Sequence, residues 1–249
     1  MMALIADWFK TLHEQTNWNF SVFYNAWEAR KYFTGLTIAT ELTVWSLIGS
    51  MLIGFICIFL KQSSLRPLRW LVTSYVELFR NTPGLAQLYF LFFGIGSYFH
   101  LSTYGPNGEL PLVSPFQFVV IALSLQYGAF VTEILRAGIE AVPRSTLEAA
   151  ESLGYDRTKA MIHIVLPLAF RTSLPALGNN MAQIVKSTAL AYAIAVPEAL
   201  YVAHEIWTEH FNVVEMMNVV LLSYLGLMGV FTLLVKLLEH WLKVPGLGR

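Results

Sequence analysis

The sequence predicts an all-α integral membrane protein with five transmembrane helices. Of its 249 residues, 56% are hydrophobic and only 13% are charged, whereas about 25% of the residues in a typical soluble domain are charged. A helix needs about 20 largely apolar residues to cross a bilayer. Five stretches meet this requirement and predict spans at about 36–60, 82–99, 115–136, 174–196 and 215–237.

The overall composition excludes several other classes of protein. Basic and acidic residues balance at 16 each, so the chain lacks the excess of Lys and Arg that is typical of nucleic-acid-binding proteins. An aromatic fraction of 14% argues against intrinsic disorder. The single Cys57 rules out an internal disulfide or a metal site built from several thiolates of this chain.

Prolines mark the ends of several predicted spans. Thr82-Pro83 and Ser114-Pro115 each place a capping hydroxyl before a proline at the first helical position. Pro175 has the same first-turn role in the fourth span. Pro197 is expected to end that span, because proline lacks the N–H donor and clashes with the preceding turn.

Basic residues gather in alternate connecting segments, which predicts the orientation. The segments 61–80 and 136–171 and the C-terminal tail carry four, five and three Lys or Arg, and the loops 100–114 and 197–214 carry none. The residues are Lys61, Arg66, Arg69, Arg80, Arg136, Arg144, Arg157, Lys159, Arg171, Lys236, Lys243 and Arg249. Because cytoplasmic loops are enriched in Lys and Arg, we expect an external N-terminus and a cytoplasmic C-terminus.

The predicted organisation has three parts. Residues 1–33 form an N-terminal extracytoplasmic or interfacial segment, residues 34–240 form the five-helix transmembrane domain, and residues 241–249 form a cytoplasmic tail. The first part is too polar and too long for a cleaved signal peptide. Its aromatic residues favour a position at the membrane surface, and the alternative is a frayed tail.

The loop 143–167 between spans three and four is the most informative segment. Ser145 and Glu148 have the spacing of a capping box, which predicts a helix from Thr146 to about Leu153. Gly154 is the expected stop residue. Asp156 then caps a second helix to about Val165, which Pro167 terminates. Physical reasoning alone leaves open an ordinary amphipathic loop helix.

This loop resembles the EAA signature of bacterial ABC importer permeases. The family pattern is E-A-A-x3-G-x9-I-x-L-P, and Glu148-Ala149-Ala150, Gly154 and Ile164-Val165-Leu166-Pro167 meet each of its defined positions. The resemblance implies the type I ABC importer permease fold, in which this elbow is the coupling helix that docks on a cytoplasmic ATPase. It also implies contacts to that ATPase. The residues concerned are Glu148, Ala149, Ala150, Leu153 and Gly154.

The resemblance covers roughly residues 33–240. In detail, the sequence is similar to the polar amino-acid permeases of the histidine, glutamate and glutamine type. The segments that carry it are 76–83, 87–88, 133–143, 166–171, 174–175 and 186–190. The sequence departs from that subgroup at Glu41, Ser187 and Ala189.

The resemblance implies a set of partners in the bacterial inner membrane. These are a second homologous permease subunit (as a heterodimer), a dimer of ABC ATPase subunits, a periplasmic substrate-binding protein, a polar amino-acid substrate and the lipid bilayer. No Gly-rich Lys-Ser/Thr phosphate loop occurs in the chain, so ATP and Mg must bind to the ATPase subunits. We expect no cofactor, no metal, no nucleic acid and no catalytic residue in this chain. His204, Glu205, Glu209 and His210 match no defined zinc spacing.

Lys186 lies near the middle of the predicted fourth span, where a charge is costly unless it is paired or lines a cavity. One interpretation is that Lys186 binds a substrate carboxylate, which mildly favours acidic amino acids. The alternative is a permanent pair with a glutamate of this subunit or its partner. The candidate substrate pathway comprises Lys186, Gln183, Ser187, Thr188, Gln126 and Gln87.

Two further pairs have helix-surface spacing. Glu77 with Arg80 and Glu133 with Arg136 are i,i+3 pairs, for which we expect structural ion pairs, with gate positioning as the alternative. On the predicted external side, Glu198, Glu205 and Glu209 either are solvated charges or lie near a gate.

Two other functions compete with the importer. An ion-coupled secondary amino-acid transporter would act without an ATPase, and a structural membrane scaffold would transport nothing. The elbow favours the importer over both.

Overall fold

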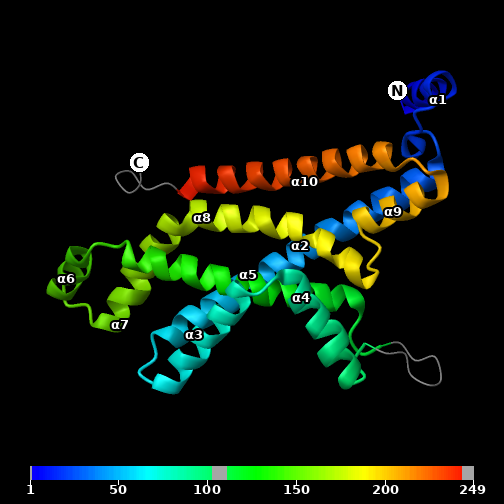
Figure 1. The fold of residues 1–249 in the computed structure, drawn as a ribbon. Helices are drawn as coiled ribbons and strands as arrows, with labels where there is room; N and C mark the ends of the chain where they lie inside the picture. Colours follow the sequence, from blue (N-terminus) through cyan, green and yellow to red (C-terminus); the bar gives the residue numbers. More distant parts are fainter. Residues whose placement is uncertain (1, 103–110, 243–249) are drawn as a thin grey trace. The chain divides into compact units, whose positions relative to one another are not determined.

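The computed structural model describes residues 2–102 and 111–242, and these residues form helices and no strands (Figure 1). The α-helices are α1 (Met2–Thr16), α2 (Ala26–Lys61), α3 (Arg66–Asn81), α4 (Gly84–Tyr89), α5 (Pro115–Glu140), α6 (Arg144–Ser152), α7 (Arg157–Ala160), α8 (Leu166–Ser187), α9 (Ala199–His210) and α10 (Val213–Leu242). Two 3-10 segments, η1 (Ser21–Phe23) and η4 (Thr188–Ile194), and two π-helical segments, η2 (Phe90–Gly96) and η3 (Met161–Val165), complete the order. The all-α prediction is therefore confirmed.

Four helical stretches are long and apolar enough to cross a membrane. They are Ala26–Lys61, Pro115–Glu140, Arg157–Ile194 and Val213–Leu238, and a shorter apolar helix covers Gly84–Gly96. The four long helices contain the predicted first, third and fifth spans and most of the fourth. The shorter helix falls within the predicted second span, 82–99, which is thus shorter than expected.

Some helix ends differ from the predicted ones. The helix that holds the first span begins at Ala26, so the predicted boundary at residue 33 falls inside α2. The next helix, α4, begins at Gly84 and not at Pro83, and the Thr82 hydroxyl donates to the Leu78 carbonyl at 2.7 Å. The cap at Ser114 is confirmed: the Gln117 N–H donates to its hydroxyl at 3.3 Å, and Gln117 Oε1 accepts from the Ser114 N–H at 2.8 Å.

Prolines in the fourth span do not interrupt the helix. Pro167 and Pro175 both lie inside the stretch Arg157–Ile194, against our expectations. A proline removes one backbone donor and crowds the carbonyl four residues earlier. The π-helical turn at Met161–Val165 widens the backbone directly before Pro167 and thereby accommodates that ring. The stretch ends at Ala195, whose φ is 57°, before Pro197 is reached.

The chain divides into two compact units. The first comprises Met1–Trp45, Leu85–Val120 and Val185–Gly229. In this unit the N-terminal part of α2 packs with α9 and α10 around an apolar core. The fully or largely buried residues of that core are Val22, Tyr32, Ala199, Val202, Ala203, Ile206, Met216, Val219 and Val220.

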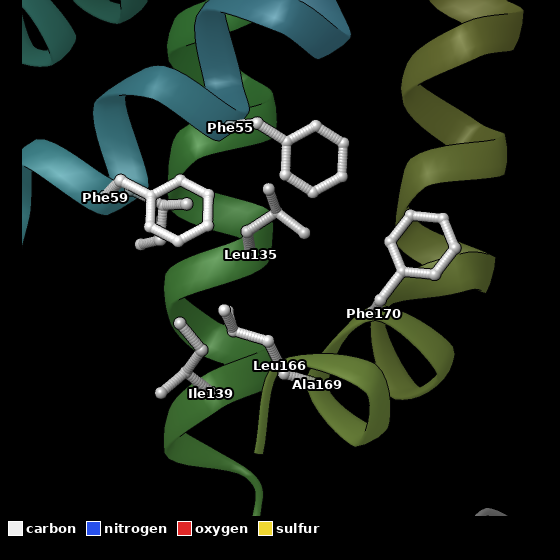
Figure 2. Close-up of a pocket in the computed structure, with 8 residues that line it drawn as sticks. Phe55, Phe59, Leu135, Ile139, Leu166, Ala169 and Phe170 are labelled. Atoms are coloured by element: carbon white, nitrogen blue, oxygen red, sulfur yellow. The ribbon is translucent and has the colours of Figure 1, made fainter. Parts of the chain in front are cut away.

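The second unit comprises Ser46–Gly84, Ile121–Ile184 and Val230–Arg249. Here α2 and α5 approach closely at Gly54, where an added Cβ would collide with the side chain of Val131. A small apolar cavity of about 50 Å³ lies among α2, α5 and α8, and Figure 2 shows the aromatic rings of Phe55, Phe59 and Phe170 around it. The residues that line this cavity are all apolar.

Candidate functional site

The elbow between α5 and α8 has the stop signal that the sequence predicts. Gly154 adopts a φ of +85°, which a glycine tolerates without steric cost. Its N–H donates to the Glu151 carbonyl at 3.0 Å, and the N–H of Tyr155 donates to the Ala150 carbonyl at 3.1 Å. This pair of bonds is the Schellman arrangement that ends a helix.

The two helix starts in the elbow differ in how well the sequence predicts them. The capping box at Ser145 is wrong, since α6 begins at Arg144 and Pro143 is its N-cap without a side-chain bond. Pro143 has a φ of −58° and a ψ of 138°, so the helix can begin directly after it. The cap at Asp156 is confirmed: the Lys159 N–H donates to its Oδ1 at 2.8 Å. That hydrogen bond is the main reason why the pKa of Asp156 lies below its usual value.

The predicted coupling residues do not all lie at the surface. Glu148, Ala149 and Gly154 are exposed, and the side chain of Leu153 is 78% exposed. Ala150, by contrast, is only 2% exposed, on a helix that packs against α7 and η3. Ala150 therefore allows the close packing of the elbow and offers little surface to a partner.

The elbow stands on an apolar base. Val142, Val165 and Ala169 form a buried cluster at the ends of α5 and α8, with Leu147 of α6 packed against it. The contacts of this base therefore come from both of the helices that flank the elbow.

A charge cluster ties three helices together in the same unit. Glu133 of α5 accepts from Lys61 Nζ at 2.8 Å and from Arg136 Nε at 3.0 Å, and Arg80 lies 3.7 Å away. The predicted pair of Glu133 with Arg136 is thus confirmed. The predicted pair of Glu77 with Arg80 is wrong, since in the described part of the chain Arg80 pairs with Glu133 and Glu77 has no ion pair.

An open pocket of about 460 Å³ lies beside this charge cluster. Its walls come from α3, α5 and α8, and its polar lining includes Arg80, Glu133, Arg136, Thr172 and Ser173. The Thr172 and Ser173 hydroxyls donate to the carbonyls of Ala169 at 2.9 Å and Ile134 at 3.2 Å. The pocket thus has charged side chains at its rim, and the two hydroxyl groups in its wall already donate hydrogen bonds within the protein.

The structure places Lys186 in the last turn of α8, with its side chain exposed. Among the described residues it makes no ion pair. A permanent pair with a glutamate elsewhere in the described parts of this chain is therefore not formed.

The other predicted pathway residues have varied environments. Thr188 is fully buried and donates to the Val185 carbonyl at 2.8 Å, Gln87 is 9% exposed, and Ser187 is half-buried. Like Lys186, these three residues belong to the first unit. In the second unit, Gln126 lies against Gly84, and Gln183, whose side chain is exposed, accepts at its carbonyl from the Tyr127 hydroxyl at 3.4 Å.

Sequence reasoning missed the burial of Glu198. This side chain is 0% exposed, and it caps α9 by accepting from the N–H groups of Leu200 at 2.9 Å and Tyr201 at 3.0 Å. The Tyr224 hydroxyl of α10 donates to it at 2.6 Å. Burial raises the pKa of Glu198 more than these hydrogen bonds lower it. Its position directly after Pro197 and before an apolar helix was the available sequence signal.

A second buried carboxylate lies at the start of α2. Glu28 is 2% exposed and accepts hydrogen bonds from Ser21, from Asn25 at 2.6 Å and from His210 at 2.8 Å. Of the other acidic residues in the segment 197–214, Glu205 pairs with Lys31 at 3.0 Å. Over the described residues, no three His, Cys, Asp or Glu side chains come together as a metal site.

Comparison with known proteins gives concordant matches. Residues 37–244 match the family described as the binding-protein-dependent transport system inner membrane component. The chain is 32% identical to the L-cystine transport system permease protein TcyB of Bacillus subtilis (strain 168), over 83% of this chain and 82% of that protein. It is 31% identical to the arginine ABC transporter permease protein ArtM of Escherichia coli (strain K12), over 83% and 91% of the two chains.

Solved structures agree with these matches. An amino acid ABC transporter crystallised with histidines superposes with a TM-score of 0.75 and 29% identity, over 85% of this chain and 94% of that one. The inward-facing MetNI methionine ABC transporter superposes with a TM-score of 0.62 at 14% identity, over 87% and 96%, which shows a shared fold. This chain therefore belongs to the inner membrane component family of binding-protein-dependent transport systems, as a multi-pass permease subunit of an ABC transporter with the type I importer fold.

Proposed function

We propose that this subunit imports polar amino acids and that it couples to its ATPases through α6. The observation that carries the coupling role is the geometry of the elbow. It presents Glu148, Ala149 and Leu153 to solvent on a short helix that is anchored on α5 and α8. The amino-acid substrates named for the relatives support the substrate class.

The proposal includes the other components of the transporter. A second permease, homologous and not identical, completes the pathway, and two ATPase subunits bind ATP and Mg and dock on the elbows. A periplasmic binding protein delivers the amino acid. This chain itself catalyses no reaction. The positive-inside rule supports a periplasmic N-terminus and a cytoplasmic C-terminus, although residues 243–249 of the predicted tail lie outside the described residues.

The coupling follows from rigid packing. When the ATPase dimer closes on ATP, it displaces α6, and the apolar base of the elbow carries this displacement into α5 and α8. Packed cores respond by moving as bodies and not by deforming continuously. The permease thereby alternates between inward-facing and outward-facing states.

Reconstitution tests this function. The complex with its ATPase and binding protein should take up a polar amino acid into proteoliposomes only when ATP is present on the ATPase side. An ion-coupled carrier, the competing function, would take up substrate along an ion gradient without the ATPase. Uptake of that kind, or a complex that transports no amino acid, would overturn the proposal.

Lys186 is the residue that we propose for substrate recognition, and Gln183, Ser187, Thr188, Gln126 and Gln87 are the other candidate residues of the pathway. Its exposed ammonium without an ion pair in the described part of the chain supports this role. Loss of a charge-assisted hydrogen bond costs about 1.5–3 kcal/mol, and 1.4 kcal/mol corresponds to a factor of ten. Lys186→Met should therefore reduce uptake about 10- to 100-fold and leave assembly intact.

The matched control for Lys186 is Lys236→Met on α10. Lys236 is also an exposed lysine without an ion pair among the described residues, and its loss should leave uptake unchanged. Size-exclusion chromatography in detergent measures assembly for both variants. Dissociation of the complex in Lys186→Met alone would instead indicate a structural pair with the partner permease.

A further inference from the structure

An apolar groove of about 520 Å³ lies in the first unit, between the N-terminal parts of α2 and α10. Its floor is preformed: Tyr32 is 3% exposed, and its hydroxyl donates to Ser223 Oγ at 3.0 Å. Its walls come from α2 and α10, and its roof comes from α1 and η1. The lining residues are Phe9, Phe20, Val22, Phe23, Tyr32, Phe33, Leu36, Asn218, Val219, Leu222 and Ser223. The volume is in the range of ordinary ligand pockets, about 300–1,000 Å³.

Aromatic rings hold the roof of the groove together. Phe9 of α1 stacks on Phe23 with ring centroids 4.5 Å apart, and Phe20 lies 5.6 Å from Phe9. Two hydrogen bonds fasten this segment to the start of α10. The Asn19 N–H donates to Glu215 Oε1 at 2.9 Å, and Asn212 Nδ2 donates to the Asn19 carbonyl at 2.7 Å. The roof is therefore a fixed part of the unit.

The groove opens toward the hydrocarbon of the membrane. Both of its walls belong to helices that are long and apolar enough to span a bilayer. At its edges the side chains of Phe33 and Leu222 are 64% and 67% exposed. Trp side chains settle at the membrane–water interface, and Trp8, Trp18 and Trp27 are exposed in and next to the roof segment. The groove thus begins at the interface and extends along α2 and α10 toward the membrane interior.

Two basic residues lie close in the sequence to residues that line the groove. Lys10 directly follows Phe9, and Arg30 precedes Phe33 by three residues, on the same face of α2. Both are exposed, and neither makes an ion pair with another described residue. Lys31 is different, because it pairs with Glu205 and lies over the ring of Trp27. Lys10 and Arg30 are therefore available to an anionic group at the interface.

The family match begins at residue 37, so α1, η1 and the wall from Tyr32 to Leu36 lie outside the matched residues.

We propose that this groove binds a membrane phospholipid, with one acyl chain between α2 and α10 and the phosphate at Lys10 and Arg30. The apolar lining is suited to the acyl chain, and the positive charges of the two unpaired cations complement the negative charge of the phosphate. With the orientation proposed above, the lipid belongs to the periplasmic leaflet. The bound lipid fastens the N-terminal segment to the first unit.

Native mass spectrometry of the intact transporter complex tests the site. The complex is delipidated in detergent and titrated with phosphatidylglycerol, and the bound lipids are counted. Leu222→Trp fills the groove and should remove one tightly bound lipid per copy of this subunit. The matched control is Leu225→Trp, because Leu225 is similarly exposed at 58% on the same helix but does not line the groove. It should keep that lipid.

A second variant tests the headgroup without filling the groove. Lys10→Gln combined with Arg30→Gln should weaken phosphatidylglycerol binding at least about tenfold, since two charge-assisted contacts are lost. Equal lipid counts in wild type, Leu222→Trp and the double variant would overturn the proposal. So would release of the second permease subunit by Leu222→Trp and not by Leu225→Trp, which would make the groove a subunit contact. Neither outcome depends on whether the complex transports an amino acid.

Discussion

Glu148→Lys is expected to abolish ATP-coupled uptake and to leave the permease folded. Glu148 is exposed on α6, and substitutions at such positions usually change stability by less than about 0.5 kcal/mol. At a docked interface, however, an unfavourable charge costs several kcal/mol. Since each 1.4 kcal/mol is a factor of ten, uptake should fall by more than about 100-fold. Uptake into proteoliposomes and co-purification of the ATPase measure the two effects.

The control for this charge reversal is Glu77→Lys on α3. Glu77 is likewise an exposed helical glutamate without an ion pair among the described residues, but it lies outside the elbow. It should retain both uptake and the bound ATPase. If Glu148→Lys transports as well as Glu77→Lys, α6 is not the coupling element.

Glu198→Ala should cause a large loss of stability. It leaves the N–H groups of Leu200 and Tyr201 and the Tyr224 hydroxyl without their acceptor in a fully buried place. Each unsatisfied buried group costs about 1–3 kcal/mol, so the loss of the acceptor for three donors should cost at least about 3 kcal/mol. The apparent Tm of the purified complex measures it.

Glu209→Ala provides the comparison on the same helix. Glu209 is exposed on α9 and makes no ion pair among the described residues, so its removal should leave the Tm unchanged. Equal Tm values for the two variants would mean that the buried carboxylate contributes nothing to α9.

The same carboxylate predicts a pH dependence of stability. Burial raises the pKa of Glu198 above its usual value of 4.5, so the folded protein takes up this proton more readily than the unfolded chain. Its contribution to stability is full below the usual pKa and is lost as the pH rises through the folded pKa. Above pH 4.5, the Tm of Glu198→Gln should therefore fall less steeply with rising pH than the Tm of the wild type. Parallel curves would contradict this assignment.

The elbow shows which structural features can be predicted from short-range sequence rules. The stop at Gly154 and the cap at Asp156 follow from the sequence, because each depends on bonds between residues at most five positions apart. The expected helix end at Pro167 and the expected helix start at Pro175 were wrong, because the π-helical turn and the surrounding packing keep the helix continuous. A proline penalty of about 3 kcal/mol is small beside the cost of unpacking a spanning helix.

The charged residues show where sequence reasoning stops. Spacing along a helix correctly paired Glu133 with Arg136, but it assigned Arg80 to Glu77, the nearest acid on its own helix. The actual partner, Glu133, also binds Lys61 from 72 residues away in the chain. Helical spacing contains no information about which helix lies next to α5.

By itself, the sequence determined the all-helical membrane fold, the approximate spans and the form of the elbow. These features follow from the length of apolar stretches and from short-range backbone bonding, and both are properties of contiguous residues. Only the tertiary structure decided that Glu198 is buried, that Ala150 faces inward and that Glu133 joins three helices. Burial and ion pairing depend on the side chains that neighbouring helices supply, and that neighbourhood exists only after the helices have packed.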